Sequence, residues 1–204
     1  MRRLRRYLLI SVLFFTSVSL CAGESSRSDA DSSGKHKISF AYGFGSLYVF
    51  GLELGHAFGS LFADPVDTSS SHFGPLSLSY EKLVTKHVAL GIVFSYAKIN
   101  MESIYSDLEV VRDEYNLYML APKLLLTWGG NVLSVYHGIS LGVGISHVTT
   151  EESEGERRSE LHFGPAVHVF LVGFNLRFAD TVSLFADVGG GYLGSLNVGV
   201  GIHL

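Results

Sequence analysis

The 204-residue chain is 47% hydrophobic, carries a formal net charge of −4 and has a mean hydropathy of +0.30. A net negative charge excludes the basic surface typical of nucleic-acid-binding proteins. Beyond the first residues, the sequence contains no unbroken apolar run of about eighteen residues, which argues against a bundle of transmembrane helices. High apolar content without such runs is typical of a membrane β-barrel.

Residues 1–23 have the pattern of a secretory signal peptide, with four arginines near the start, an apolar run and then Cys21, Ala22 and Gly23. We expect cleavage near Ala22 or Gly23, which would remove the only cysteine. The alternative is that Cys21 is the lipidated residue of a lipoprotein. After cleavage, eleven Lys and Arg face nineteen Asp and Glu, so the net charge falls to near −8. Residues 24–35 are polar and predict a periplasmic tether.

The clearest strand lies at residues 132–147. Apolar side chains occupy most odd positions, whereas even positions from 138 carry only glycine and serine. A period of two predicts a β-strand, because successive side chains leave opposite faces. An oily face opposite a nearly bare one suits a strand between lipid and a narrow lumen. We therefore expect Leu141 and Val143 to face lipid and Gly142 to face the lumen.

The same alternation recurs seven more times between residue 36 and the end of the chain. It is found near residues 38–44, 76–81, 88–97, 118–127, 161–171, 182–188 and 196–204. We expect strands of mostly about 9–12 residues, enough to cross a bilayer at a tilt. Mostly long connections, near 46–71, 99–114, 149–160 and 189–195, alternate with tight turns. The sequence thus predicts an all-β domain over 36–204: an eight-stranded antiparallel up-and-down transmembrane β-barrel.

Two places interrupt the alternation. Residues 46–62 are apolar, with Gly51, Gly55 and Gly59 four apart. They are compatible with a membrane-surface helix, a cap over the barrel mouth, a locally packed loop or a long hairpin arm. Past Gly173, apolar residues move from odd to even positions. Either a bulge at Gly173 turns Asn175 and Arg177 inward, or the strand ends there.

Three segments, ISFAYGFG, GPLSLSYE and the final GVGIHL, resemble the small outer-membrane β-barrel proteins of Bacteroidetes-type bacteria, and more distantly the eight-stranded OmpA/OmpX type. The resemblance covers most of the chain after the signal peptide. It implies export to the outer membrane of a Gram-negative cell, contact with outer-membrane lipid and insertion by the barrel assembly machinery. It implies little about activity.

The predicted lumen holds a polar network among small residues. Its members are Glu81, Lys123, His168, Arg177 and Asp187. A buried charge needs a partner, so we expect opposite charges to brace the narrow interior. We expect Glu81 to pair with Lys123, with Arg177 as its alternative partner.

No catalytic, cofactor-binding or metal-binding site is predicted. His162 and His168 share a face, but their spacing places them roughly 20 Å apart along a strand, too far to bind one ion. The expected outer rim has His72, His147, His162, Ser146 and Glu160, which any solvated rim can contain. We expect a non-enzymatic monomer with a surface, structural or interaction role and an unknown extracellular partner. The alternatives are a narrow channel for small solutes and, less favoured, a lipid-modifying barrel enzyme.

Overall fold

Eight antiparallel strands form a closed barrel in chain order in the computed structural model, and β1 pairs with β8 to complete the ring. The structure describes residues 36–46, 51, 65–105, 110–152 and 157–204. The strands are β1 His36–Phe44, β2 Pro65–Leu83, β3 Val88–Tyr105, β4 Val110–Gly129, β5 Leu133–Glu152, β6 Arg157–Arg177, β7 Val182–Gly191 and β8 Leu196–His203. The predicted fold class is confirmed.

Several sequence predictions lie outside the described residues. These are the signal peptide, the tether and almost all of residues 46–62. Among the residues that the structure does describe, no helix is both long enough and apolar enough to cross a membrane.

The predicted facing of β5 is confirmed. Leu141 and Val143 are 59% and 52% exposed on the outside of the barrel, whereas Ser140 is 1% exposed inside. Gly142 points inward, and a Cβ added there would lie 2.6 Å from the Cβ of Ala121. Two strand neighbours thus approach closely in the lumen only because one of them has no side chain.

Outward-facing apolar side chains form a continuous band around the closed part of the barrel, here called the apolar belt. It includes Phe40, Leu78, Ile92, Leu120, Leu141, Val167, Leu184 and Val200, all 40% or more exposed. Every one of the eight strands contributes to it. A water-soluble barrel would have charged or polar residues at these positions, so the belt requires an apolar surrounding.

The strand containing the phase change has a bulge, as one of the two alternatives predicted, but the bulge lies earlier than expected. The register of β6 shifts against both β5 and β7 at Leu171–Val172, not at Gly173. The extra residue moves the inward positions from even to odd numbers, so Asn175 and Arg177 point into the barrel. The strand continues to Arg177, which rules out its ending at Gly173.

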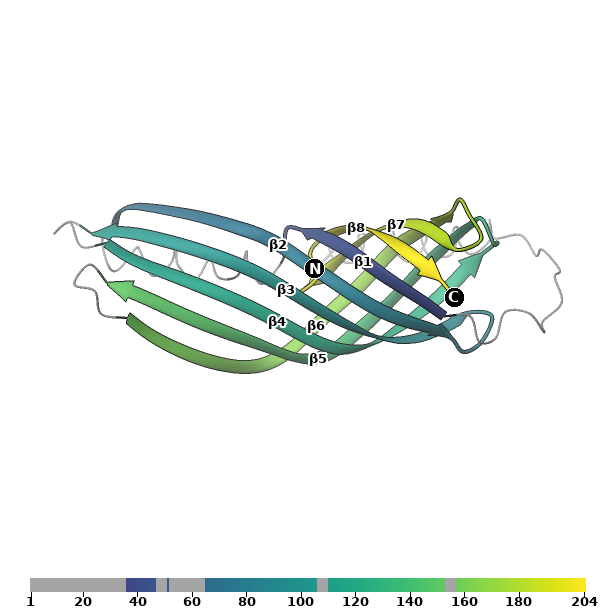
Figure 1. Ribbon diagram of the computed structural model, residues 1–204, viewed down its shortest axis with the longest axis horizontal. Helices are drawn as coiled ribbons and strands as arrows, with labels where there is room; N and C mark the ends of the chain where they lie inside the picture. Colours follow the sequence, from purple (N-terminus) through teal and green to yellow (C-terminus); the bar gives the residue numbers. More distant parts are fainter. Residues whose placement is uncertain (1–35, 47–50, 52–64, 106–109, 153–156) are drawn as a thin grey trace, which may run out of the picture.

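Five strands are much longer than predicted. β2 to β6 have 18 to 21 residues, whereas β1, β7 and β8 have 8 to 10. Most of the predicted long connections near 99–114 and 149–160, and residues 65–71 of the one near 46–71, therefore belong to strands. Figure 1 shows β2 to β6 running well past the ends of β1, β7 and β8. We call this part, residues 65–73, 98–105, 110–116, 147–152 and 157–163, the extension. In β3, for example, apolar Ile99 and Met101 face inward and Asn100 faces outward, the reverse of the belt, so a pattern with apolar side chains outside did not reveal this part.

The facing of β5 generates a stability prediction. Replacing Leu141 with Arg should destabilise the protein by about 2–4 kcal/mol in a bilayer, because a charge would replace an apolar side chain in the belt. The measurement is reversible unfolding in lipid vesicles. The matched control is Asn100→Arg, at an exposed position on the outer face of the extension, where little change is expected. Equal stability of Leu141→Arg and the parent would contradict the facing.

Candidate functional site

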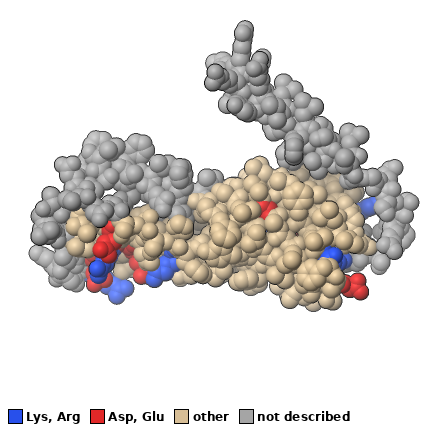
Figure 2. Space-filling model, turned by 90° about the horizontal axis from the view of Figure 1, so that it is seen from above, with Lys and Arg blue, Asp and Glu red and all other residues tan. Residues whose placement is uncertain are grey.

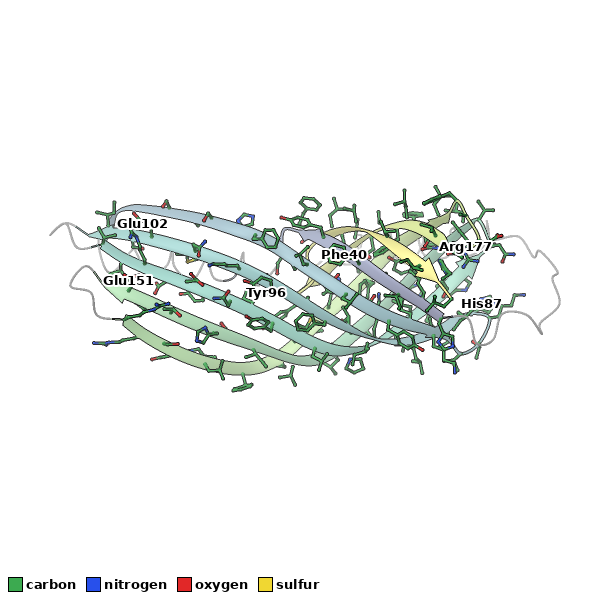
Figure 3. The ribbon with its side chains drawn as sticks, in the orientation of Figure 1. Phe40, His87, Tyr96, Glu102, Glu151 and Arg177 are labelled. Atoms are coloured by element: carbon green, nitrogen blue, oxygen red, sulfur yellow. The ribbon has the colours of Figure 1, made fainter. Side chains whose placement is uncertain are left out.

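All five residues of the predicted polar network face the lumen. Glu81, Lys123, His168 and Asp187 are 5%, 7%, 0% and 3% exposed, and Arg177 is half-buried near one end. Figure 3 shows Arg177 and His87 at the end of the barrel opposite Glu102 and Glu151. The five do not form one network. They belong to separate groups, each with its own partners.

The first group is centred on Glu81 of β2. Lys123 of β4 donates a hydrogen bond from Nζ to Glu81 Oε1 over 2.7 Å, and Lys37 Nζ of β1 lies 3.5 Å from Oε2. Ser79 donates to the same carboxylate over 3.4 Å and is itself 2.7 Å from Ser39. One buried carboxylate therefore bridges three strands.

Strand β3 lies between Glu81 and Lys123, and a glycine makes their contact possible. Gly91 is in register with both residues, and a Cβ added to it would lie 3.1 Å from Glu81 Cγ. Because strands are about 4.8 Å apart, two long side chains can meet over an intervening residue only when that residue leaves space. A side chain at Gly91 would occupy the space that the Glu81 and Lys123 side chains cross to reach each other.

Sequence reasoning missed Lys37, although a signal was present. Lys37 has the same parity as Ser39 and Ala41, which face the lumen, and it pairs directly with Glu81 in register. The predicted strand began at residue 38, one position after Lys37, whereas β1 begins at His36. Lys37 Nζ also lies 4.8 Å from the centre of the Phe185 ring, and Lys123 Nζ lies 4.7 Å from that of Phe170. These aromatic faces partly replace the water lost by the two ammonium groups.

The second group satisfies Asp187 with neutral donors instead of a cation. Tyr136 donates from its hydroxyl to Oδ2 over 2.7 Å, and Asn197 donates from Nδ2 to Oδ1 over 2.8 Å. The Tyr136 ring occupies the space beside Gly173, where a Cβ would lie 2.6 Å from ring carbon Cε1. Asp187 thus ties β5, β7 and β8 together, without a salt bridge among the ion pairs of the described residues.

The third group places Arg177 beside a histidine, not beside Glu81. Arg177 donates from Nη2 to Nδ1 of His203 over 2.8 Å, and His203 Nε2 lies 2.9 Å from the hydroxyl of Ser183. A guanidinium can only donate, so Nδ1 accepts and the neutral imidazole carries its proton on Nε2. That tautomer donates to Ser183 and cannot remove its proton. The serine and histidine therefore lack the arrangement of a nucleophile with a general base.

His168 stands apart from the other members. Its Nδ1 accepts a hydrogen bond of 3.3 Å from the backbone N–H of Leu193, and its ring packs against Phe170 at a centroid distance of 4.5 Å. Its Nε2 is buried without a hydrogen-bond partner among the described residues. His162 lies instead in the extension, where its Nε2 is 3.2 Å from Glu160. No group of three potential metal ligands occurs in the described part of the chain.

Two of the three histidines expected at the rim, His147 and His162, have local partners. His147 Nε2 is 2.8 Å from the hydroxyl of Ser159, not of Ser146. His162 contacts Glu160, its neighbour in the same strand. Catalysis of acyl transfer requires a base that is oriented by a third group as it contacts the nucleophile. Within the described residues, His147 contacts a serine and His162 contacts a carboxylate, so neither histidine joins the two.

The interior between these groups is filled. Small and aromatic side chains pack there as one cluster: Ala41, Ala89, Val93, Met119, Ala121, Leu125, Tyr136, Ala166, Phe170, Phe185 and Leu193. The Phe185 ring takes the space beside Gly199, as Tyr136 does beside Gly173. The site is therefore a packed, internally hydrogen-bonded core, consistent with the small interior of an eight-stranded barrel.

Comparison with known proteins found no matching family model and no matching curated protein. Among solved structures, Ail, the attachment invasion locus protein of Yersinia pestis, is 14% identical, with a TM-score of 0.47 over 84% of this chain and 99% of that chain. The N-terminal β-barrel domain of Pseudomonas aeruginosa OprF is also 14% identical, with a TM-score of 0.44 over 84% of this chain and 100% of that one. At these scores the likeness carries no argument about function; the fold rests on the strand pairing itself.

The Glu81 group generates a prediction for a double-mutant cycle. Glu81→Gln should cost about 3–5 kcal/mol, because it leaves two lysines without their carboxylate in a poorly solvated site. Lys123→Met should cost less, since Lys37 still pairs with Glu81. The double variant should cost less than the sum, because contacting residues are not additive. Reversible unfolding in lipid vesicles measures all three losses, and strict additivity would show that the 2.7 Å contact contributes nothing.

Proposed function

We propose that this protein is a non-enzymatic barrel of the bacterial outer membrane, exported by a cleaved signal peptide, whose extension presents a surface to extracellular partners. The observation that carries the proposal is the division of the same strands into an apolar belt and a polar extension. A spanning barrel must pair all its backbone groups where it meets lipid, and the ring is closed throughout the belt.

Aromatic residues at the two margins of the belt support a membrane position. At one end, Tyr80 is hydrogen-bonded to His36 and Trp128 stacks on His137. At the other, the rings of Tyr96 and Tyr118 lie 5.2 Å apart. Aromatic residues with one polar end favour the boundary between lipid and water. The two margins thus fit the two interfaces of one bilayer.

Charged residues begin immediately beyond the Tyr96–Tyr118 margin. On the outer face of the extension, Lys98 pairs with Glu114 at 2.9 Å and Arg112 pairs with Glu102 at 3.0 Å. Hydrogen bonds from Lys98 and Asn116 lower the pKa of the Glu114 carboxyl, which keeps it charged. Figure 2 shows charged side chains gathered toward the ends of the described part, with a largely uncharged surface between them. The charged outer face of the extension favours a position in water.

The extension also has a strand edge suited to contact another chain. Within the described residues, β7 pairs with β6 only from His168 onward, so the preceding part of β6 has no strand on that side. Unpaired N–H and C=O groups in water can accept an extended segment of a partner. Exposed Leu161 and Phe163, 54% and 67%, lie along this edge. The chemistry of such a partner is an extended peptide with apolar side chains.

The surface role and the orientation can be tested together by labelling of cysteines in intact cells. The only cysteine, Cys21, belongs to the predicted signal peptide, so introduced thiols report alone. Asn100→Cys, in the extension, should react with a membrane-impermeant maleimide in intact cells. Lys86→Cys, in the turn between β2 and β3 at the opposite end, should react only after permeabilisation. The reverse pattern would mean that the extension faces the periplasm.

Conductance in planar bilayers distinguishes the proposed surface role from the alternative of a narrow channel for small solutes. The packed interior and the Glu81 group favour a sealed lumen, so the purified protein should give no stable ohmic current steps. Glu81→Gln is the informative variant, because it removes the carboxylate that links β1, β2 and β4. Reproducible steps from the parent protein would replace the surface role with that of a small-solute channel.

A further inference from the structure

The connection between β7 and β8 folds across the barrel mouth at the end where the extension begins. Ser195 donates from its backbone N–H to the carbonyl of Phe44 over 2.7 Å and from its hydroxyl to that of Gly45 over 2.5 Å. Ser46 donates to the carbonyl of Gly191 over 3.2 Å. The end of β1 thus holds both ends of this connection, residues 191–195, which we call the cap.

The centre of the cap enters the lumen. Leu193 is 4% exposed and packs in the main core cluster. Gly191 and Gly194, with φ of +135° and +111°, allow the turn that carries it inward. The backbone N–H of Leu193 donates to Nδ1 of His168, which stands on β6 beneath it. His168 therefore makes the polar contact between the lumen wall and the centre of the cap.

This contact requires a neutral imidazole. Nδ1 accepts the hydrogen bond through its lone pair, so the single ring proton lies on Nε2. Taking up a second proton at Nδ1 would place an N–H against the N–H of Leu193. It would also create a cation whose Nε2 has no acceptor among the described residues. A buried ion without a partner is strongly unfavourable, so a protonated His168 is incompatible with the closed cap.

The charged groups around His168 add to this incompatibility. The positive charge of Lys123 on β4 repels a protonated His168. Both side chains contact the same Phe170 ring. Asp187 of β7 faces the same lumen, but both of its oxygens already accept hydrogen bonds from Tyr136 and Asn197. Ser140, the cross-strand neighbour of His168 on β5, does not titrate. Because His168 Nε2 has no hydrogen-bond partner within the described residues, no carboxylate in this part of the chain contacts the imidazole at that nitrogen.

We propose that the cap is an acid-sensitive latch: protonation of His168 at Nδ1 breaks its hydrogen bond from Leu193 and releases residues 191–195 from the barrel mouth. The proton comes from solution, and no covalent bond changes. In the released state the imidazole meets water and takes up a proton near pH 6.5, as an exposed histidine does. Release would expose the Leu193 side chain and open the lumen down to His168, above the Glu81 group.

The latch predicts a definite pH dependence. Because opening is linked to the uptake of one proton, the opening constant should rise about tenfold for each pH unit below roughly 6.5. Hydrogen exchange of the Leu193 amide in the unmodified protein, reconstituted in lipid nanodiscs, measures this constant when the observed rate is divided by the intrinsic rate at each pH. The reference is the Thr127 amide, bonded to the His87 carbonyl over 2.8 Å at the far end, whose protection should not change.

The variant His168→Gln assigns the effect. Glutamine can accept from the Leu193 N–H but does not titrate, so Leu193 protection should become independent of pH. If the variant does not fold, as judged by heat-dependent migration on a gel, the slope in the parent protein still tests the latch. A parent slope of zero overturns the proposal. So does an unchanged slope in His168→Gln, or an equal loss of protection at Thr127, which would indicate general loosening by protonated Glu81 or Asp187.

Discussion

Closing eight strands into a ring leaves an interior so narrow that each large side chain needs a glycine beside it. Tyr136 lies beside Gly173, Phe185 beside Gly199, and the Glu81–Lys123 pair passes over Gly91. Several of the glycines that appear in the sequence as the bare face of a strand are therefore matched to specific neighbours. The lumen reaches high packing density there because a large side chain of one strand fills the space left by a glycine of a neighbouring strand.

The polar contacts of the lumen follow from the same constraint. Glu81 reaches over one strand to Lys123, Tyr136 over one strand to Asp187, and Arg177 over one strand to His203. Backbone pairing links only neighbouring strands, whereas these three bridges join β2 to β4, β5 to β7 and β6 to β8. These bridges resist flattening of the ring into an oval, a deformation that would leave the backbone hydrogen bonds between neighbouring strands intact. A half-satisfied network would cost more than an apolar core, which explains why each charge has at least one close partner.

Alternation was sufficient to predict the fold and the facing, because lipid outside and a crowded lumen inside act on every residue of the belt. Alternation failed to predict positions outside the apolar belt, where these two surroundings no longer apply. In the extension of β3, apolar Ile99 and Met101 face inward and polar side chains face outward, so a pattern with apolar side chains outside did not predict a strand there. Lys37 was missed because it lies one residue before the first apolar position. Gly173 was taken for the bulge, but its absent side chain makes room for Tyr136, and the bulge lies at Leu171–Val172.

The place where pairing stops on β6 agrees with the place where the belt stops. The carbonyl of Val167 accepts from Tyr192, which shows that this residue directs its backbone groups toward β7. By alternation Pro165 and Phe163 point the same way, and Pro165 has no N–H to leave unpaired. Beyond Val167, the next N–H that points toward the β7 side of this edge therefore belongs to Phe163. Phe163 is in register, through Ile145, with the Tyr118–Tyr96 pair at the margin of the belt. An open edge is highly unfavourable in lipid, whereas its backbone groups can be hydrated in water, so a proline at this place allows the ring to open where the apolar belt ends.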